Sequence, residues 1–420
     1  MEQVSAGALE ETFARQREAF ASAPYPPAAD RRANLKRLLD TVLRHQDQIA
    51  AAIDRDFGGR SRDEVLFSEI YVAVNAIKHA RRHVHHWMTA RPRNVGWTLQ
   101  PATAFVLPQP LGVVGIIVPW NYPVFLSIAP LAGALAAGNR VLLKLSEHTP
   151  ETSALLGQII EETFPEDLVA VIAGDAAAGQ AFSALPFDHL LFTGATAVGR
   201  DVMGAAARNL TPVTLELGGK SPAIIAPGAN IERAAADIAY GKLLNAGQTC
   251  IAPDYVLVPE AIRERFIDAL RKAVARYYPD GQYTSIINEK HFARLRGYLD
   301  EARARGVEAV TLGAGGGRRI APTVLIDPPE DLAVMRDEIF GPILPLKTYH
   351  TIDEAIAYVN DRPRALALYL FARDRRVIDR VLTRTVAGGV CINDTLLHIA
   401  AEDLPFGGVG PSGMGHYHGR

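Results

Sequence analysis

Short apolar runs rich in β-branched residues alternate with helical stretches from Thr103 onward, and this alternation restricts the fold more than any other feature. The first runs after the segment TAFVLPQP are GVVGIIVP, RVLLKLSE, LVAVIAG and DHLLFTG. Helical segments separate them, at the spacing of β-α-β units. Because such crossovers are right-handed, the strands should form a parallel sheet covered by helices on both faces. The pattern predicts an α/β fold with a doubly wound, Rossmann-type domain.

A second alternating series begins after the segment 211–220 and runs to GGVCIND near the C-terminus. The length of 420 residues suits two or three domains rather than one core. We therefore expect a first domain over 1–98 and 110–217, including a helical region over about 8–90, and a second α/β domain over 218–420. TAFVLPQP precedes the next strand without an intervening helix, so residues 99–109 are expected to leave the body as a β arm.

Charge and cysteine content limit the classes of partner and compartment. The chain has 44 basic and 46 acidic side chains, a formal net charge of -2. That balance gives no general field for nucleic acid or an anionic membrane, so we expect a small-molecule partner. Two cysteines exclude a disulfide framework and fit a reducing compartment, the cytoplasm. The N-terminal segment reads as a soluble amphipathic helix without signal-peptide features.

Two features suggest a membrane or metal role but are better explained otherwise. The uncharged window Leu111–Asn139 is long enough for a membrane span. Its internal prolines favour a strand, a loop and a helix instead. His83, His85 and His86 have no carboxylate or cysteine at ligand spacing, so we expect a solvated helix face and no metal site.

Cys250 and a glycine-rich turn are the first candidates for chemistry. Cys250 stands between Gly-Gln-Thr and Ile-Ala-Pro, at a loop next to a helical pattern. It is either a nucleophile or a small buried hydrophobe. The turn Thr193–Gly199 follows a strand and opens a helix, but Thr196 replaces the middle glycine of a dinucleotide fingerprint. Backbone N–H groups there could bind a pyrophosphate, or the glycines could serve only a tight turn.

Seven motifs occur in a fixed order along the chain. They are PWNYP, KLSEHTP, FTGATAVG, LELGGKSP, GQTC, EIFGP and PFGGVGPSG. Together they resemble the motif series of the NAD(P)-dependent aldehyde dehydrogenase superfamily. The finer pattern, with GQTCIAPDY and the ending LPFGGVGPSGMGHYHG, resembles the class 3-like branch and the bacterial coniferyl aldehyde dehydrogenases. The resemblance implies NAD(P)-dependent oxidation of an aromatic or medium-chain aldehyde to the acid.

Oxidation of an aldehyde requires a tetrahedral adduct, because the carbonyl carbon alone has no electron pair to release as hydride. The resemblance assigns the attacking thiol to Cys250, whose pKa would have to fall below the free value to give useful thiolate at neutral pH. Asn121 matches the family's oxyanion-hole amide, together with the backbone N–H of Cys250. An asparagine beside proline could instead only cap its own loop.

The thioester that follows must be hydrolysed, and the resemblance assigns the general base to Glu216. A partly desolvated carboxylate there would have a pKa raised toward the working pH. Glu216 could instead pair with a lysine such as Lys220. The resemblance also places Lys144 in the catalytic set, and Tyr122 and Phe406 in the substrate pocket.

For the cofactor, Lys144 and Glu147 match contacts of the adenosine ribose. A carboxylate accepts hydrogen bonds from a 2′-hydroxyl and repels a 2′-phosphate, so NAD is favoured and NADP remains open. Glu338 and Phe340 match contacts of the nicotinamide ribose, although EIFGP could also be a helix end stopped by Gly-Pro. The other implied cofactor contacts are Val118, Pro119, Trp120, Ser146, Thr193, Gly194, Ala195, Val198, Leu217 and Gly218.

Two departures from the family pattern affect these expectations. Ala195 stands where many relatives carry a serine that bonds the pyrophosphate. The chain stops at Arg420, whereas relatives continue with residues for the substrate funnel and subunit contacts. A homodimer is expected through the 99–109 arm. Two alternatives stay open, namely a CoA-acylating dehydrogenase and a non-catalytic protein that keeps the fold.

Overall fold

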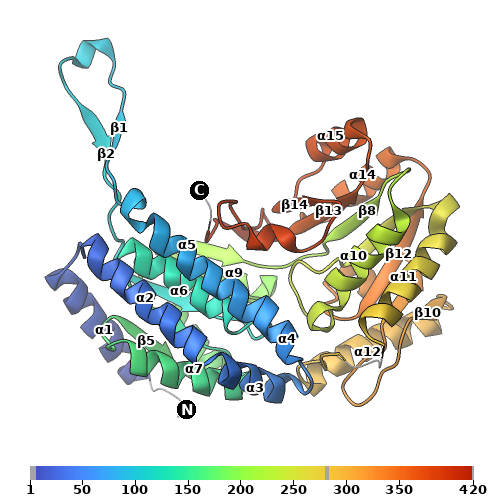
Figure 1. The fold of residues 1–420 in the computed structure, drawn as a ribbon, viewed down its shortest axis with the longest axis horizontal. Helices are drawn as coiled ribbons and strands as arrows, with labels where there is room; N and C mark the ends of the chain where they lie inside the picture. Colours follow the sequence, from blue (N-terminus) through green and yellow to red (C-terminus); the bar gives the residue numbers. More distant parts are fainter. Residues whose placement is uncertain (1–5, 280–282, 419–420) are drawn as a thin grey trace. The chain divides into compact units, whose positions relative to one another are not determined.

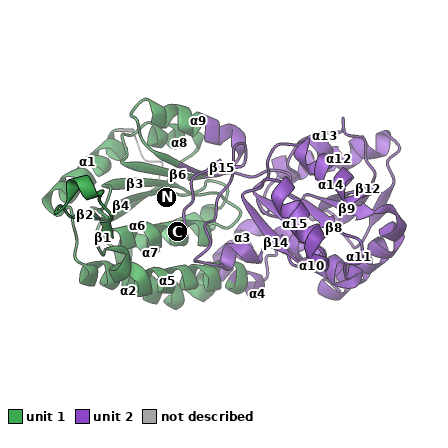
Figure 2. Cartoon of the chain, turned by 90° about the horizontal axis from the view of Figure 1, so that it is seen from above, with its two compact units in different colours: residues 1–49, 66–192, 201–213 green, residues 50–65, 193–200, 214–420 purple. Residues whose placement is uncertain are grey.

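The computed structural model describes residues 6–279 and 283–418, and the chain divides into two compact units (Figure 2). Unit 1 comprises Met1–Ile49, Leu66–Phe192 and Asp201–Val213, and unit 2 comprises Ala50–Val65, Thr193–Arg200 and Thr214–Arg420. The last point at which the chain passes from unit 1 to unit 2 lies between Val213 and Thr214, close to the predicted boundary after residue 217. Segments 50–65 and 193–200, which the prediction places in the first domain, belong to unit 2.

Unit 1 contains a parallel sheet in the order β6-β3-β4-β5. The strands are β3 (Val113–Ile117), β4 (Arg140–Lys144), β5 (Val169–Ile172) and β6 (His189–Thr193). The helices that follow these strands are α6 (Phe125–Ala137), α7 (Pro150–Thr163), α8 (Ala176–Ser183) and α9 (Thr196–Ala207), of which α9 belongs to unit 1 only from Asp201 onward. Most residues of β3 and β4 are buried, as expected for strands with helices on both faces. The predicted parallel α/β layout is confirmed.

The N-terminal region is helical, as expected, but it is not one continuous run. Its helices are α1 (Ala6–Ser22), α2 (Ala28–Arg44), α3 (Gln46–Phe57), α4 (Arg62–Val65), the π-helix η1 (Leu66–Tyr71) and α5 (Val72–Trp87). The first five residues of the expected N-terminal helix lie outside the described part. In unit 1, α2 and α5 pack against α6. The ring of His83 stacks on Trp87, with 5.7 Å between ring centroids.

A β-hairpin follows α5. Strand β1 (Arg91–Arg93) pairs antiparallel with β2 (Ala104–Val106), and the 3₁₀ turn η2 (Trp97–Leu99) lies between them. The hairpin extends away from α2 and α5 (Figure 1). The paired segment therefore begins at Arg91, earlier than the expected arm over 99–109, because the TAFVLPQP strand needs an antiparallel partner to satisfy its backbone groups.

Unit 2 contains a seven-stranded sheet in the order β10-β11-β12-β9-β8-β13-β14, parallel except for the edge strand β10. The strands are β8 (Pro222–Ile225), β9 (Tyr255–Pro259), β10 (Ala309–Thr311), β11 (Thr323–Ile326), β12 (Ile343–Tyr349), β13 (Ala367–Phe371) and β14 (Gly389–Ile392). The helices are α10 (Ile231–Leu243), α11 (Arg263–Tyr277), α12 (Glu289–Ala304), α13 (Ala333–Arg336), α14 (Ile352–Asn360) and α15 (Arg375–Arg384). The short 3₁₀ turns are η3 (Leu244–Gly247), η4 (Glu260–Ile262) and η5 (Leu397–Ala400). Strand β15 (Gly413–Met414) pairs antiparallel with β7 (Val213–Glu216).

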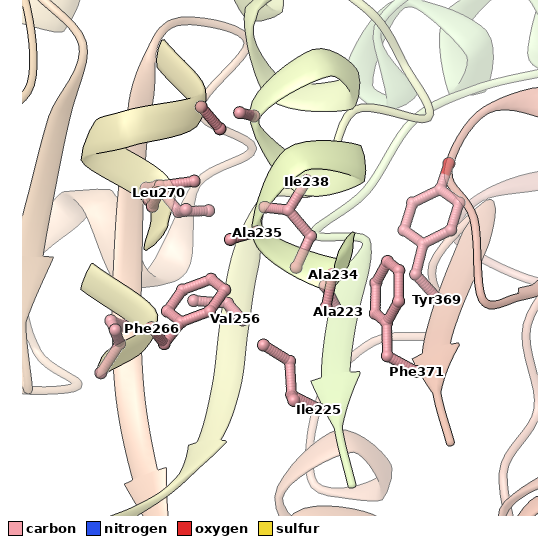
Figure 3. Close-up of a cluster of buried hydrophobic side chains, with 14 of the residues drawn as sticks. Ala223, Ile225, Ala234, Ala235, Ile238, Val256, Phe266, Leu270, Tyr369 and Phe371 are labelled. Atoms are coloured by element: carbon pink, nitrogen blue, oxygen red, sulfur yellow. The ribbon is translucent and has the colours of Figure 1, made fainter. Parts of the chain in front are cut away.

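The core of unit 2 fixes the helix that leads to Cys250 (Figure 3). Ala234, Ala235 and Ile238 of α10 are buried among side chains of β8, β9, β13 and α11. The small alanines let α10 approach the sheet closely, and each large apolar side chain buried here contributes about 1.5–3 kcal/mol. Cys250 is partly buried against this same cluster. No helix among the described residues is both long and apolar enough to cross a membrane.

Candidate active site

A constrained turn carries Cys250. After α10 the chain passes through η3, where Asn245 and Ala246 adopt positive φ angles of 51° and 54°. Gly247 follows with φ 76°, and a Cβ atom there would lie 2.4 Å from the carbonyl oxygen of Gly341. Only glycine fits this position, so the turn before the thiol is fixed by close backbone packing.

Gln248 ties the same turn to a neighbouring loop. Its side-chain nitrogen donates to the carbonyl oxygens of Asn245 (3.0 Å) and Ser285 (3.1 Å). Its side-chain oxygen accepts from the N–H of Ile287 at 2.9 Å. Gln248 is fully buried, so these bonds satisfy polar atoms that water cannot reach. Gln248 belongs to the GQTC motif, but its role in holding the turn was not predicted from the sequence.

The pKa of the Cys250 thiol is raised to about 12, first by burial and then by the carboxylates of Glu338 and Glu216, while the N–H groups of Cys250 and Ile251 oppose the shift. The expected pKa of this thiol lay below the free value, and the structure of the protein alone gives the opposite direction. The physical reason is that desolvation and two acidic neighbours all disfavour a thiolate.

Glu216 ends β7 and is 3% exposed. Neither carboxylate oxygen has a hydrogen-bond partner among the described residues. Burial raises its pKa to about 9, which agrees with the expected direction. Lys220 pairs with Asp254 and donates to the carbonyl oxygens of Val334 and Asp337. The alternative in which Glu216 pairs with Lys220 is therefore wrong.

The C-terminal segment packs around Glu216. In the β7–β15 pair, Gly413 lies opposite Glu216. A Cβ atom at Gly407 would lie 3.1 Å from Oε1 of Glu216 and 2.2 Å from the carbonyl oxygen of Gly415. The glycines of the PFGGVGPSG motif thus allow two backbone segments to enclose the carboxylate.

The EIFGP motif forms the loop between α13 and β12. Helix α13 ends at Arg336, before the motif begins, so the motif is not the end of a longer helix. Arg294 donates to the carbonyl oxygens of Glu338 (3.3 Å) and Ile339 (2.9 Å). Phe340 has a positive φ of 52°. These contacts hold the loop in one conformation.

The carboxylate of Glu338 lies against the backbone of Gly218. A Cβ atom at position 218 would be 2.2 Å from Oε2 of Glu338. Burial raises the pKa of Glu338 to about 8, with Asp254 adding to the shift. Oε1 of Glu338 is buried without a hydrogen-bond partner among the described residues. A buried acceptor of this kind is available to a ligand hydroxyl.

The glycine-rich turn packs closely against the end of β7 and the residue that follows it. The N–H of Gly194 donates to the carbonyl oxygen of Glu216 at 3.0 Å. A Cβ atom at Gly199 would lie 2.6 Å from a methyl group of Leu217, so this glycine lets α9 approach the chain after β7. Ala195 and Val198 are exposed at the start of α9. Both alternatives from the sequence remain compatible with this geometry.

Unit 1 holds the other predicted contacts on the loops after β3 and β4. Val118, Asn121 and Tyr122 are buried between β3 and α6. The N–H of Val118 donates to the carbonyl oxygen of Lys144 at 2.9 Å, which links the two loops. Pro119 and Trp120, on the loop after β3, are half-buried.

Lys144 and Glu147 form an ion pair after β4. Nζ of Lys144 lies 3.0 Å from Oε2 of Glu147. Burial alone would raise the pKa of Glu147, but its own backbone N–H, Lys144 and His148 together hold that pKa below its ordinary value. The buried hydroxyl of Ser146 accepts from the N–H of His148 at 3.2 Å. Glu147 is therefore held as a carboxylate at the edge of unit 1.

The family model described as "Aldehyde dehydrogenase family" matches residues 1–420. The chain belongs to the aldehyde dehydrogenase family. It is 56% identical over 417 residues to a protein of Pseudomonas aeruginosa named "Probable coniferyl aldehyde dehydrogenase", covering 98% of this chain and 88% of that protein. It is 47% identical over 400 residues to the "Coniferyl aldehyde dehydrogenase" of a Pseudomonas species, covering 93% and 83%.

Solved structures agree with this assignment. The substrate-bound AldH of Staphylococcus aureus is 40% identical, with a TM-score of 0.94 over 98% of this chain and 90% of that chain. An aldehyde dehydrogenase of Mycobacterium tuberculosis solved with NAD+ and an NADP-dependent enzyme of E. coli are each 29% identical, with TM-scores of 0.91 over 100% of this chain and 88% of theirs. Both cofactors therefore occur among the structural neighbours of this NAD(P)-dependent aldehyde dehydrogenase.

Aromatic residues of unit 2 complete the surroundings of Cys250 in this aldehyde dehydrogenase. Phe406 is buried, stacks on His398 (5.7 Å between centroids) and meets Tyr417 edge-on (5.9 Å). The hydroxyl of Tyr417 is buried without a hydrogen-bond partner among the described residues. Burial raises the pKa of Tyr417, and Glu216 and Cys250 raise it further. No role was predicted for Tyr417 from the sequence, although it lies in the C-terminal motif. The final residues 419–420 lie outside the described part.

Proposed function

We propose that this enzyme oxidises an aromatic aldehyde of the coniferaldehyde class to its carboxylic acid with NAD, using Cys250 as nucleophile and Glu216 as general base. One observation carries the proposal. In unit 2 the thiol of Cys250 has its pKa raised first by burial and then by Glu338 and Glu216, and Glu216 is a buried carboxylate neither of whose oxygens has a hydrogen-bond partner within residues 6–279 and 283–418. A thiol beside an unpaired base is the arrangement that covalent acyl transfer requires.

The proposed reaction runs through two species on Cys250. The sulfur adds to the aldehyde carbon, giving a thiohemiacetal whose oxygen accepts hydrogen bonds from the side-chain amide of Asn121 and the N–H of Cys250. Oxidation gives a thioester. Glu216 then removes a proton from a water molecule while the oxygen of that water attacks the thioester carbon. The carbon–sulfur bond breaks, the sulfur of Cys250 leaves with the electron pair, and the carboxylic acid is released. Bound NAD supplies the two-electron acceptor.

The residues of this chain fit such a cofactor. Oε1 of Glu338 is buried and has no hydrogen-bond partner in the described part of the chain, and together with the absence of a side chain at Gly218 it suits a ribose diol. We assign the adenosine ribose to Glu147, whose carboxylate favours a 2′-hydroxyl over a 2′-phosphate. Lys144 is engaged by Glu147, which supports NAD as the preferred cofactor. The remaining residues predicted from the motifs, including Thr193, Gly194, Ser146 and Trp120, stay in this proposed set.

The proposed substrate class rests on the coniferyl aldehyde dehydrogenases among the relatives and on the aromatic cluster of Phe406, His398 and Tyr417. The test is NADH formation with coniferaldehyde, benzaldehyde and hexanal, comparing wild type with C250S and E216Q. We expect the highest kcat/KM with coniferaldehyde and no turnover in C250S. E216Q should release about one NADH per site rapidly and then turn over slowly. A preference for hexanal would overturn the aromatic assignment, and full turnover by C250S would overturn the mechanism.

Transfer of the acyl group to CoA is the second candidate reaction. Glu216 argues against it, because a general base for water is not needed when a thiol accepts the acyl group. Turnover without added CoA, giving free acid, supports hydrolysis. A rate that depends on CoA and yields an acyl-CoA would favour the alternative.

We further propose that the enzyme acts in the cytoplasm as a homodimer. Two free cysteines fit a reducing compartment. The hairpin exposes several large apolar side chains, among them Trp97 (87% exposed) and Phe105 (65%). An exposed apolar arm of this kind is typical of a subunit contact.

A further inference from the structure

A carboxylate outside the predicted site is bonded to the start of the helix that follows Asn121. Oε2 of Glu69 accepts from the N–H of Val124 at 3.0 Å and from the N–H of Phe125 at 2.7 Å. Glu69 is fully buried in unit 1. The residue at the N-terminal boundary of α6 is Val124, which has no side-chain oxygen to cap the helix. Glu69 supplies from another helix the acceptor that a local Ser, Thr, Asp or Asn would normally give.

The π-helix η1 explains how Glu69 reaches that position. Ser68, Glu69 and Ile70 of η1 are buried, whereas Phe67 and Tyr71 on either side are exposed and stack on each other. A π-helical turn holds one extra residue, so it turns side chains away from the direction that a continuous α-helix would give. Helix α5, which continues from η1, packs beside α6 (Figure 1).

The same first turn of α6 contains the residues next to Asn121. The carbonyl oxygen of Tyr122 accepts the N–H of Leu126 at 3.0 Å, and the hydroxyl of Ser127 donates to the carbonyl oxygen of Pro123. The bonds from Val124 and Phe125 to Glu69 hold this turn to the rest of unit 1. Asn121 precedes Tyr122 directly, so the direction of its side chain depends on where the turn is held.

We infer that Glu69 is a positioning residue, which orients the Asn121 loop for oxyanion stabilisation through its two bonds to the start of α6. The inference rests on the proposed function, because that function gives Asn121 its role. Glu69 acts through the loop, and no contact with substrate or cofactor is proposed for it.

The test is a double-mutant cycle between Glu69 and Asn121, measured as the single-turnover rate of thioester formation. We expect N121A to lower this rate by about 10²–10³-fold. E69A should lower this rate by about 10–100-fold, since moving a catalytic group such as the Asn121 amide by about 1 Å can lower a rate by that much. In the N121A background E69A should lower the rate further by less than about threefold, because both substitutions remove the same effect, the stabilisation of the oxyanion by Asn121. The KM for NAD should stay within about twofold in E69A.

E69Q separates positioning from loss of the fold. Glutamine keeps a side-chain oxygen that can accept both N–H groups, so E69Q should retain the rate within about fivefold. If E69A does not fold, E69D takes its place in the cycle, because aspartate shortens the side chain by one methylene group.

D374A is the matched control. Asp374 caps α15 by accepting from the N–H of Arg376, and α15 carries no proposed site residue, so D374A should lower stability without changing the rate.

The possible results test the role of Asn121 and the role of Glu69 separately. A wild-type rate in N121A would contradict the proposed function. If N121A forms the thioester slowly but E69A forms it at the wild-type rate, the inference on Glu69 is wrong and the proposed function stands. The same holds if E69A lowers the rate in the N121A background by as much as it does in wild type. Equal losses in E69Q and E69A would also overturn it.

Discussion

The backbone of Gly218 lies directly against the carboxylate of Glu338 in unit 2. A Cβ atom at position 218 would be 2.2 Å from one oxygen of that carboxylate and 2.3 Å from the other. The carboxylate of Glu338 can therefore occupy its position only because residue 218 has no side chain.

G218A should displace Glu338 and weaken NAD binding. Loss of hydrogen bonds to a charged group should raise the KM for NAD by about 10–100-fold. G297A is the control, because Gly297 lies within α12 with no atom near its missing Cβ, and alanine there should stabilise the helix. Initial rates at varied NAD concentration measure both variants. An unchanged KM in G218A would remove Glu338 from the cofactor site.

Hydrolysis of the thioester should depend on the ionisation of Glu216. Burial raises the pKa of Glu216 to about 9, and only the carboxylate form acts as a base. The single-turnover hydrolysis rate should therefore rise about tenfold per pH unit below pH 9 and level off above it. E216Q should be slower and nearly independent of pH. A flat profile in wild type would contradict the role of Glu216.

The same pKa predicts how stability depends on pH. The folded-state pKa of Glu216 lies above the unfolded value, so the folded protein holds a proton that the unfolded chain releases. The contribution of protonated Glu216 to the free energy of unfolding is complete below about pH 4.3 and is lost as the pH rises toward 9. E216Q should therefore have a Tm close to wild type at pH 5 and several degrees higher at pH 9.5. Thermal unfolding followed by circular dichroism checks this difference, which an equal Tm at both pH values would contradict.

The Cys250 thiol should react slowly with iodoacetamide in the protein alone. With its pKa raised to about 12 by burial, Glu338 and Glu216, its thiolate fraction at pH 7 is roughly 10⁻⁵. At pH 9.5 Glu338, with its pKa of about 8, is ionised, so E338Q removes the larger of the two charge effects on Cys250 and should speed alkylation severalfold at that pH. Both proteins carry C391S, so that Cys250 is the only thiol measured. Alkylation of Cys250 as fast as a free cysteine would show that the thiol is already activated.

The hairpin should decide the oligomeric state. Replacing Trp97 and Phe105 by serine removes two of its exposed apolar side chains and should shift a dimer toward monomer. Leu210 is 88% exposed outside the hairpin, and L210S should leave the state unchanged. Light scattering after size-exclusion chromatography gives the mass. A monomeric wild type would contradict the proposed dimer.

The sequence predicted the strands and most helices well because their signals are local. The run GVVGIIVP became β3, and the helix closing at Gly138 became α6, with that glycine in the left-handed region at φ 87°. The β1 partner of the arm was missed because RPR has no apolar alternation. The π-helix η1 was missed because its residues also fit an α-helical pattern.

The sequence by itself determined the α/β class, the order of the elements and the family, because periodicity and motif order are written along the chain. The tertiary structure alone decided the ionisation of Cys250 and Glu216, the pairing of Lys220 with Asp254 and the bonds from Glu69 to α6. The physical reason is that desolvation and hydrogen bonding depend on groups far apart in sequence. Glu69 and Val124 are 55 residues apart, and no local pattern relates them.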